Sequence, residues 1–260
     1  MPSPTASARA TAPAAPIFVG TAGWTLPREQ QPRFPAEGTH LQRYAAMLKA
    51  AEINTTFYRS HRASTWARWA ESVPDDFRFS AKLPRAITHT ARLVDANAAL
   101  DAFLAEVAVL GAKLACLLVQ LPPSLVFETD VAAAFFQALR ERHPGCVSCE
   151  PRHATWFTAE ADALLAGASV ARVAADPVRA PGADEPGGWP ELAYFRLHGS
   201  PRMYYSEYTP EYLDALAARM AKARERGVPV WCIFDNTTLG AATGNALDLL
   251  SRLGASDAAA

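Results

Sequence analysis

The chain has 260 residues, of which 50% are hydrophobic and 20% are charged, so it can bury the core of one large domain and is not a disordered protein. Its formal net charge of -1 provides no global positive field for nucleic acid or for an acidic membrane surface. No apolar signal segment follows Met1, and apolar runs such as 113–119 are far shorter than the roughly 20 residues of a membrane span. We therefore expect a soluble, cytoplasmic protein with no membrane partner.

Residues 1–16 are mostly Ala, Pro, Ser and Thr, a composition that cannot bury enough surface to become ordered. We expect a flexible tail there, one domain over 17–254 and a short C-terminal tail over 255–260. A strand is predicted at 17–21, and the long connection that follows carries Trp24. Such a connection is either a lid that packs over a site or an ordinary packed loop. Leu41, Tyr44, Leu48 and Ala51 then recur at helical spacing, after Thr39 as a cap.

Seven further strand patterns follow, and most are separated by helical patterns. Strands are predicted at 53–58, 77–82, 114–120, 146–150, 169–176, 193–199 and 228–235, and helices at 63–71, 97–110, 130–142, 160–166, 210–226 and 240–253. A Pro- and Gly-rich loop over 177–190 is too polar and too broken to be a core element. Eight strands with long connections predict an α/β fold, a single (β/α)8 TIM barrel. An open doubly wound sheet is the alternative, disfavoured because no G-x-G-x-x-G follows the first strand.

Charged and polar side chains stand at the ends of the predicted strands, where barrel proteins of this kind place their sites. The strand that starts at Cys146 ends in Glu150, and a carboxylate at the end of a buried strand needs a cation. Lys82, on an otherwise apolar strand, likewise needs an anion. The predicted ring contains Asn54, Tyr58, Lys82, Gln120, Glu150, Arg152, Asp176, Arg196, His198, Asp235 and Asn236.

Two plainer explanations of this ring stay open. Glu150, Asp176, Arg172 and Arg196 can form a salt-bridge network that only closes the barrel. His198 can be a core imidazole whose hydrogen bonds are satisfied.

Several short motifs are distributed along the whole chain. They are G-T-A-G-W at 20–24, E-I-N-T-T-F-Y-R at 52–59, F-S-A-K-L-P-R at 79–85 with Thr88 and His89, Q-L-P-P at 120–123, E-P-R-H at 150–153 with Trp156, R-L-H-G at 196–199, and F-D-N-T at 234–237 with Asn245 and Ala246. Together, over residues 17–253, they resemble the DUF72 family, also called the YecE-like proteins. The resemblance implies a TIM barrel and no settled activity. Asp235 stands where the family has an asparagine, so the resemblance implies no role for an amide there.

The first functional hypothesis is an enzyme, a hydrolase or isomerase, that acts on a small anionic or sugar-like substrate. Glu150 and His198 would exchange protons. Arginine side chains would bind phosphate or carboxylate. The expected catalytic residues are Glu150, His198, Lys82 and Asp176, and the expected substrate-binding residues are Trp24, Asn54, Tyr58, Arg152, Arg196, Asp235 and Asn236.

Two other classes of function stay open. One is a nucleic-acid-processing protein similar to the barrel endonucleases that cut damaged DNA, and the other is a metabolite-binding protein without catalysis. We expect no cofactor, although Glu150, Asp176, His198 and Asp235 can hold at best a single divalent ion. Cys146 and Cys149 have C-x-x-C spacing but would point to opposite faces of a strand, which disfavours a redox or metal role.

Overall fold

The computed structural model describes residues 14–257, so residues 1–13 of the predicted tail lie outside the described residues. The strands are β1 (Ile17–Ala22), β2 (Ala50–Ile53), β3 (Arg78–Lys82), β4 (Leu114–Gln120), β5 (Cys146–Glu150), β6 (Val170–Arg172), β7 (Ala174–Asp176), β8 (Gly187–Gly188), β9 (Ala193–Leu197) and β10 (Val230–Phe234). The α-helices are α1 (His40–Met47), α2 (Ala63–Glu71), α3 (Asn97–Val107), α4 (Thr129–Arg142), α5 (Ala159–Gly167), α6 (Pro210–Arg224) and α7 (Ala241–Asp257). The last helix continues three residues past the expected end of the domain at 254.

The ten strands form one sheet in the order β7-β9-β10-β1-β2-β3-β4-β5-β6-β8. The predicted sixth strand is split at Val173. Its first half, β6, pairs in parallel with β5, and its second half, β7, pairs in parallel with β9. One continuous segment therefore joins the two ends of the sheet. With β6 and β7 counted together and the antiparallel β8 left out, the ten strands give the eight of a nearly closed barrel, as predicted.

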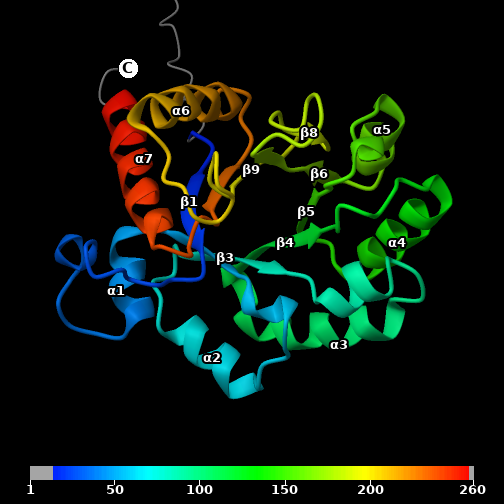
Figure 1. Ribbon diagram of the computed structural model, residues 1–260. Coiled ribbons are helices and arrows are strands. Elements are labelled where there is room, and N and C mark those ends of the chain that lie inside the picture. The colour runs from blue at the N-terminus through cyan, green and yellow to red at the C-terminus, as the bar shows by residue number, and fades with distance from the viewer. Residues whose placement is uncertain (1–13, 258–260) are drawn as a thin grey trace, which may run out of the picture.

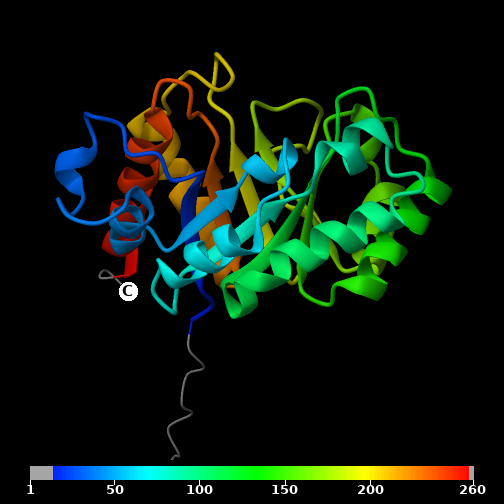
Figure 2. The same cartoon turned by 90° about the horizontal axis from the view of Figure 1, so that it is seen from below.

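The α-helices surround the strands as an outer layer (Figure 1). Between α5 and α6 the layer contains no α-helix among the described residues, and the short strand β8 lies there instead. This is the Pro- and Gly-rich segment that was expected to stay outside the core. The strand arrowheads point toward one end of the molecule, where the loops that follow the strands gather (Figure 2).

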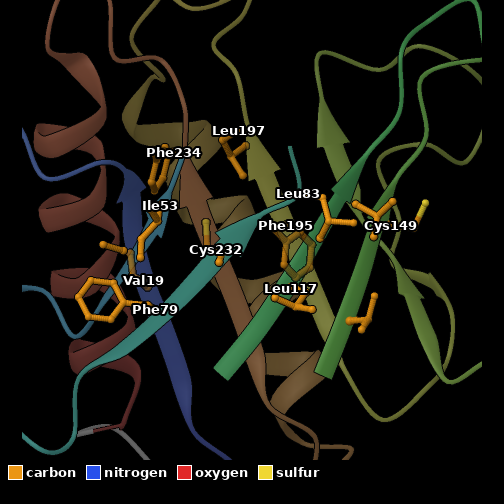
Figure 3. Packing of buried hydrophobic residues seen from close by; sticks show 14 of the residues in the cluster. Val19, Ile53, Phe79, Leu83, Leu117, Cys149, Phe195, Leu197, Cys232 and Phe234 are labelled. Carbon is orange, nitrogen blue, oxygen red and sulfur yellow. The ribbon is translucent and has the colours of Figure 1, made fainter. Parts of the chain in front are cut away.

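Alternate side chains of each strand face either the helices or the barrel interior. Val19, Phe79, Leu117 and Phe195 are among the outward residues that pack under the helices (Figure 3). A second apolar cluster fills the interior and includes Cys116, Leu118, Tyr194, Trp231 and Ile233. The rings of Tyr194 and Trp231 stack in parallel there at 5.8 Å. The interior is therefore a packed core below the charged residues and not an open channel.

The region from α1 to β2 differs from the prediction. Thr39 does cap α1, together with Gln42 in a reciprocal capping box, but the helix ends at Met47. Ala50 and Ala51 belong to β2, where Tyr44 OH donates to Ala50 O at 2.8 Å and accepts from Thr21 N at 2.8 Å. The phenol thus joins two neighbouring strands at the position where the periodicity predicted continued helix.

The predicted strand 53–58 is wrong, because β2 ends at Ile53 and residues Thr55–Phe57 form a 3-10 turn, η2. The hydroxyl of Thr56 donates to Ile53 O at 2.8 Å and to Lys82 O at 2.6 Å. These bonds tie the turn to the ends of β2 and β3. The predicted alternation of Asn54, Thr56 and Tyr58 on one strand face therefore does not exist.

The sixth strand was predicted with the wrong face inward. Ala171 and Val173 lie in the interior cluster, whereas Arg172 points to α5 and pairs with Asp162 at 2.7 Å. Short apolar residues and a long charged residue alternate in this segment, and the small ones are those that fit inside the barrel. Arg172 therefore takes no part in the interior network that was considered for it.

Candidate functional site at the mouth of the barrel

Arg196 on β9 lies at the centre of a buried ion-pair network near the carboxyl ends of the strands. Its guanidinium contacts Glu52 at 2.7 and 3.0 Å, Glu150 Oε2 at 3.0 Å and Asp235 Oδ2 at 3.0 Å. Burial alone would lower the pKa of the guanidinium, but Asp235, Glu52 and Glu150 outweigh burial and raise that pKa well above its usual range. Arg196 is therefore a permanent positive charge that holds three carboxylates together.

The imidazole of His198 lies between two of these carboxylates. Nε2 is 2.8 Å from Glu150 Oε1, and Nδ1 is 3.0 Å from Asp235 Oδ2. Arg152 Nη2 also lies 2.9 Å from Nε2. A doubly protonated ring would donate to both carboxylates, whereas a neutral ring with its proton on Nδ1 would accept from Arg152. The surroundings thus offer partners to both protonation states, as a proton-transferring group requires.

Glu150 at the end of β5 is held by side chains from three strand ends. Besides Arg196, it accepts from Arg152 Nε at 3.0 Å and from Gln120 Nε2 at 3.2 Å through both oxygens. Burial would raise the pKa of the Glu150 carboxyl, but His198, Arg196 and Arg152 together hold it well below its usual range. Glu150 is therefore ionised at neutral pH, and its direct effect is on the orientation and charge of His198.

Lys82 ends β3 at the same mouth and is 5% exposed. Its Nζ lies 4.1 Å from the centroid of the Phe57 ring, and within residues 14–257 no hydrogen bond or ion pair engages it. Burial, and after it Arg196, lower the pKa of the amine to about 8 against the opposing charges of nearby carboxylates. Lys82 is therefore about half neutral near pH 8.

Glu52 is the principal residue of the network that was not predicted. It is 0% exposed and binds both Arg196 and the hydroxyl of Tyr194, which lies 3.3 Å from Oε2 and 3.1 Å from Ser80 Oγ. The available signal was a carboxylate within the apolar run 50–53, the same signal that identified Glu150. The helical spacing that ran on to Ala51 assigned this segment to the wrong element and hid it.

The charges of the network nearly balance. With Lys82 and His198 neutral, three carboxylates and two guanidiniums leave one net negative charge. The carboxylates are those of Glu52, Glu150 and Asp235, and the guanidiniums are those of Arg152 and Arg196. One proton neutralises the group, on either His198 or Lys82. Burial would raise the pKa of Asp235, but Arg196 and His198 lower it, so this carboxylate also stays ionised.

Cations gather at the solvent side of this network. The half-buried His89, in the π-helical turn η3 (Ala86–Thr90), has a pKa lowered to about 4 by burial and then by Lys82, Arg85 and Arg152. Three positive groups thus act on one imidazole. The side chain of Arg152 is 11% exposed, and the Arg85 residue is exposed. This side of the mouth therefore favours an anionic ligand.

Three of the predicted substrate-binding residues lie apart from the charged network. Trp24, Asn54 and Tyr58 line a cavity of about 420 Å³ that also contacts Trp69 and His61 and includes no residue of the ion-pair network. Tyr58 is 78% exposed, and Trp24 packs edge-on against Trp69 at 5.1 Å. Because β2 ends at Ile53, Asn54 and Tyr58 flank the turn η2 and do not share an inward strand face.

Asp176 was expected beside Glu150 and lies elsewhere. It aligns with Leu197 in the β7–β9 register, and Leu197 belongs to the cluster between sheet and helices. Asp176 Oδ1 accepts from Tyr208 OH at 2.7 Å, and burial followed by this carboxylate raises the pKa of Tyr208 well above its usual range. Asp176 therefore does not lie beside Glu150, because the prediction turned the wrong face of this strand inward, as it did for Arg172.

Asn236 directly follows Asp235 but points away from the ring. Its Nδ2 donates to Ser206 O and to Asn245 Oδ1, both at 2.9 Å, so it ties the β9–α6 loop to α7. Its buried Oδ1 has no hydrogen-bond partner among the described residues. The contacts of Asn236 support the loop behind the mouth.

The β9–α6 loop covers His198 from the solvent side. The ring of Tyr204 packs edge-on against the imidazole at 5.6 Å, and the φ of Tyr204 is 70°, in the left-handed region. Met203 Sδ lies 3.8 Å from Arg152 Nη1. The loop thus contacts both the imidazole of His198 and the guanidinium of Arg152. Neither Met203 nor Tyr204 carried a recognisable sequence signal.

In residues 14–257 no group of three or more His, Cys, Asp or Glu side chains has an arrangement that could hold a metal ion. None of the helices in the described part of the chain is both long and apolar enough to cross a bilayer.

The chain is similar to proteins whose activity is not stated in their names. Over 138 residues it is 34% identical to the UPF0759 protein YecE of Escherichia coli K12, and this match covers 49% of each chain, so it spans about half the length of that relative. Among solved structures, a DUF72 family protein from Enterococcus faecalis V583 superposes with a TM-score of 0.77 at 21% identity and covers 92% of this chain and 95% of its own. A DUF72 family protein from Thermotoga maritima MSB8 gives 0.76 at 24% identity, covering 92% and 99%.

These two solved structures show the fold alone. The family evidence comes from the model described as "Protein of unknown function DUF72", which matches residues 18–260. The sequence motifs, the barrel and this match agree, and the chain belongs to the DUF72 family.

Proposed function

We propose that this chain is an enzyme that transfers protons on a small anionic or sugar-like substrate at the C-terminal mouth of the barrel. The observation that carries the proposal is the placement of His198, with one ring nitrogen 2.8 Å from Glu150 and the other 3.0 Å from Asp235. A histidine that only filled a core would not need charged partners on both sides. The arrangement lets the ring gain or lose a proton without moving.

In this proposal His198 is the catalytic acid and base, and Glu150 and Asp235 are positioning residues. Their low pKa values make them weak bases but effective at orienting the ring and stabilising its charged form. Arg196 keeps both carboxylates in place. One positioned acid or base contributes about 10² to 10⁴-fold to a rate, so its loss is measurable.

The charge at the mouth supports an anionic substrate. Arg152 presents its guanidinium at the rim, and Lys82 has an amine without an ion-pair partner among the described residues. Tyr204, 36% exposed and packed against His198, offers an aromatic face to the apolar side of a sugar. A phosphorylated or carboxylated sugar derivative would use all three.

The experiment begins with thermal-shift measurements over a panel of sugar phosphates and small carboxylates, because a ligand of the folded state raises the melting temperature. Each stabilising compound is then followed by NMR in D₂O for hydrogen exchange and product formation. We expect His198→Asn to lower the rate by at least about 10²-fold. Glu150→Gln should lower it less and change the pH profile, because it alters the charge beside the ring.

His143→Asn is the matched control, since His143 directly follows α4, close to the start of β5 and far along the strand from Glu150. Its turnover should equal that of the native chain. Equal turnover in His198→Asn and the native chain would refute the acid and base assignment. Binding without any exchange or product, in the native chain as well, would favour a metabolite-binding protein without catalysis.

A further inference from the structure

We propose that the amine of Lys82 forms an imine with a small anionic aldehyde or ketone. This inference rests on the proposed function, because it assigns a substrate class and a covalent step to the same mouth. It starts from the position of Lys82, which ends β3 beside the Glu150 and His198 network and is nearly buried. Its Nζ faces the Phe57 ring, and no hydrogen bond or ion pair engages it among the described residues.

The other lysines with described contacts are bound differently. The exposed Lys49 pairs with Asp76 at 3.1 Å, outside the barrel. Lys113 donates to Ala70 O and Val73 O, both at 2.7 Å. A buried ammonium ion without such partners is unfavourable, and the loss of one proton removes this penalty. The structure therefore favours a neutral, nucleophilic amine at Lys82 more than at these other sites.

The charge balance of the network permits that loss. The carboxylates of Glu52, Glu150 and Asp235 exceed the two guanidiniums by one charge, and a proton on His198 can neutralise the excess in place of one on Lys82. The low pKa of Lys82, about 8, is consistent with this arrangement. Lysines that form imines are activated in the same manner, by an apolar pocket or a nearby cation. Here Phe57 supplies the apolar surface and Arg196 the cation.

The covalent step balances with the groups at the mouth. The lone pair of the neutral Lys82 amine forms a C–N bond to the carbonyl carbon, and the π electrons move to oxygen, which takes the proton of the protonated His198 to give a carbinolamine and leaves His198 neutral. The amine nitrogen releases its extra proton to His198. That proton then returns to the hydroxyl, which leaves as water while the nitrogen lone pair forms the C=N⁺ bond. Hydrolysis reverses each step and restores the lysine, so no oxidant or reductant is required.

The anionic group of the substrate is assigned to Arg152. Its guanidinium contacts His198 Nε2 at 2.9 Å and reaches the solvent, so it borders the place where the carbonyl must lie. Arg85, which acts on His89 together with Lys82 and Arg152, adds positive charge on the same side. A carbonyl one or a few bonds from a carboxylate or phosphate would therefore be oriented toward Lys82.

The test uses the folded native chain with glyoxylate, the smallest aldehyde that carries a carboxylate, and sodium cyanoborohydride, which reduces an imine to a stable carboxymethyl-lysine. Peptide mass spectrometry then compares the labelling rates of Lys82 and Lys49 in one sample. We expect Lys82 to react about tenfold faster at pH 7 although it is nearly buried. An amine with a pKa near 8 has roughly two orders of magnitude more neutral form there than an ordinary lysine.

The labelling rate of Lys82 should rise with a midpoint near pH 8. The titratable and charged groups that face Lys82 across the mouth are Glu52 on β2, Glu150 on β5, Arg196 on β9, Asp235 after β10 and His89 in η3. Acetaldehyde is the uncharged comparison, and it should lose most of the preference for Lys82. Arg152→Met should reduce the glyoxylate rate at Lys82 toward the acetaldehyde rate and leave Lys49 unchanged.

A Lys82 rate equal to or below that of Lys49 in the folded native chain overturns the imine proposal, and this comparison needs no variant. The proposed function is judged separately, from anion binding and from the turnover of His198→Asn. The turnover of Lys82→Arg, which retains a charge but cannot form the imine, then shows whether the imine is needed for that function. If Lys82 labels slowly while anions still stabilise the chain and His198→Asn still lowers turnover, the imine fails and the proton-transfer function stands. If Lys82 labels fast and Lys82→Arg abolishes turnover, both stand.

Discussion

Arg196 determines whether the interior of the barrel is electrostatically stable, because it contacts all three buried carboxylates of the network. Arg196→Met would leave Glu52 and Glu150, both fully buried, without their principal cation. Removing one partner of a buried ion pair typically destabilises a protein by about 3–5 kcal/mol. We expect a loss of this size in urea unfolding followed by circular dichroism.

Arg172→Met is the matched control for this change. Arg172 is also buried, but its partner Asp162 has a side chain that is 35% exposed and can regain water. Its loss should therefore destabilise the chain less than the loss of Arg196. Equal losses in the two variants would mean that Arg196 acts through packing and not through its charge.

At the scale of elements, the close contact between β1 and β2 fixes where the mouth begins. A Cβ on Gly20 would lie 2.0 Å from Ala50 O, next to the Tyr44 hydroxyl that joins the two strands. Gly20→Ala would force these strands apart, and overpacking of this kind costs about 1–3 kcal/mol. We expect a lower melting temperature, measured by calorimetry.

Gly23→Ala is a nearby comparison, because a Cβ there meets no atom within 4 Å although φ is +83°. Only backbone strain acts at Gly23, so this variant should be destabilised less than Gly20→Ala. A Gly20→Ala variant as stable as the native chain would show that β1 and β2 can separate freely at this point.

Element types could be predicted from hydrophobic periodicity, and most helices begin and end within a few residues of the expected positions. Which face of a strand points into the barrel could not be predicted where small residues alternate with charged ones. In the segment 169–176 either face could have been buried, and closure of the barrel placed Ala171 and Val173 inside. For β2, helical periodicity continued into the strand, whereas the helix ends at Met47 and the Tyr44 hydroxyl donates to Ala50 O in β2.

The same limits apply to the site. Lys82, Glu150, Arg196 and His198 could be predicted, because a charged residue in an apolar strand is conspicuous. Glu52 was missed because the start of β2 was assigned to a helix. Asp176 was misplaced because the wrong face of its strand was predicted to point inward. The position of Tyr204 against His198 depends on a loop conformation with positive φ, and no local sequence pattern specified that conformation. An error in which strand face points inward thus became an error in the expected position of a site residue.

For the whole molecule, the network makes stability depend on pH in the acid range. The pKa values of Glu150 and Asp235 are lower in the folded chain than their ordinary values of 4.5 and 3.8. As the pH falls through these ordinary values the unfolded chain takes up protons first, so the stabilisation present above them is progressively lost. We expect the free energy of unfolding to fall from pH 5 downward, and Glu150→Gln to have a shallower slope than the native chain.

Glu141→Gln provides the comparison for this pH dependence, since Glu141 is exposed and lies 3.9 Å from the guanidinium of Arg142. Its slope should match that of the native chain. If the free energy of unfolding falls with the same slope against pH in Glu150→Gln as in the native chain, other carboxylates dominate the acid unfolding.

We propose that the charged mouth of the barrel binds a ligand and is not only a structural ion-pair cluster. The most direct measurement is a crystal structure of the chain with the sugar phosphate or carboxylate that stabilises it most. We expect ligand density against Lys82, Arg152 and His198. Density in the cavity lined by Trp24, Asn54 and Tyr58, with the mouth unchanged, would contradict it.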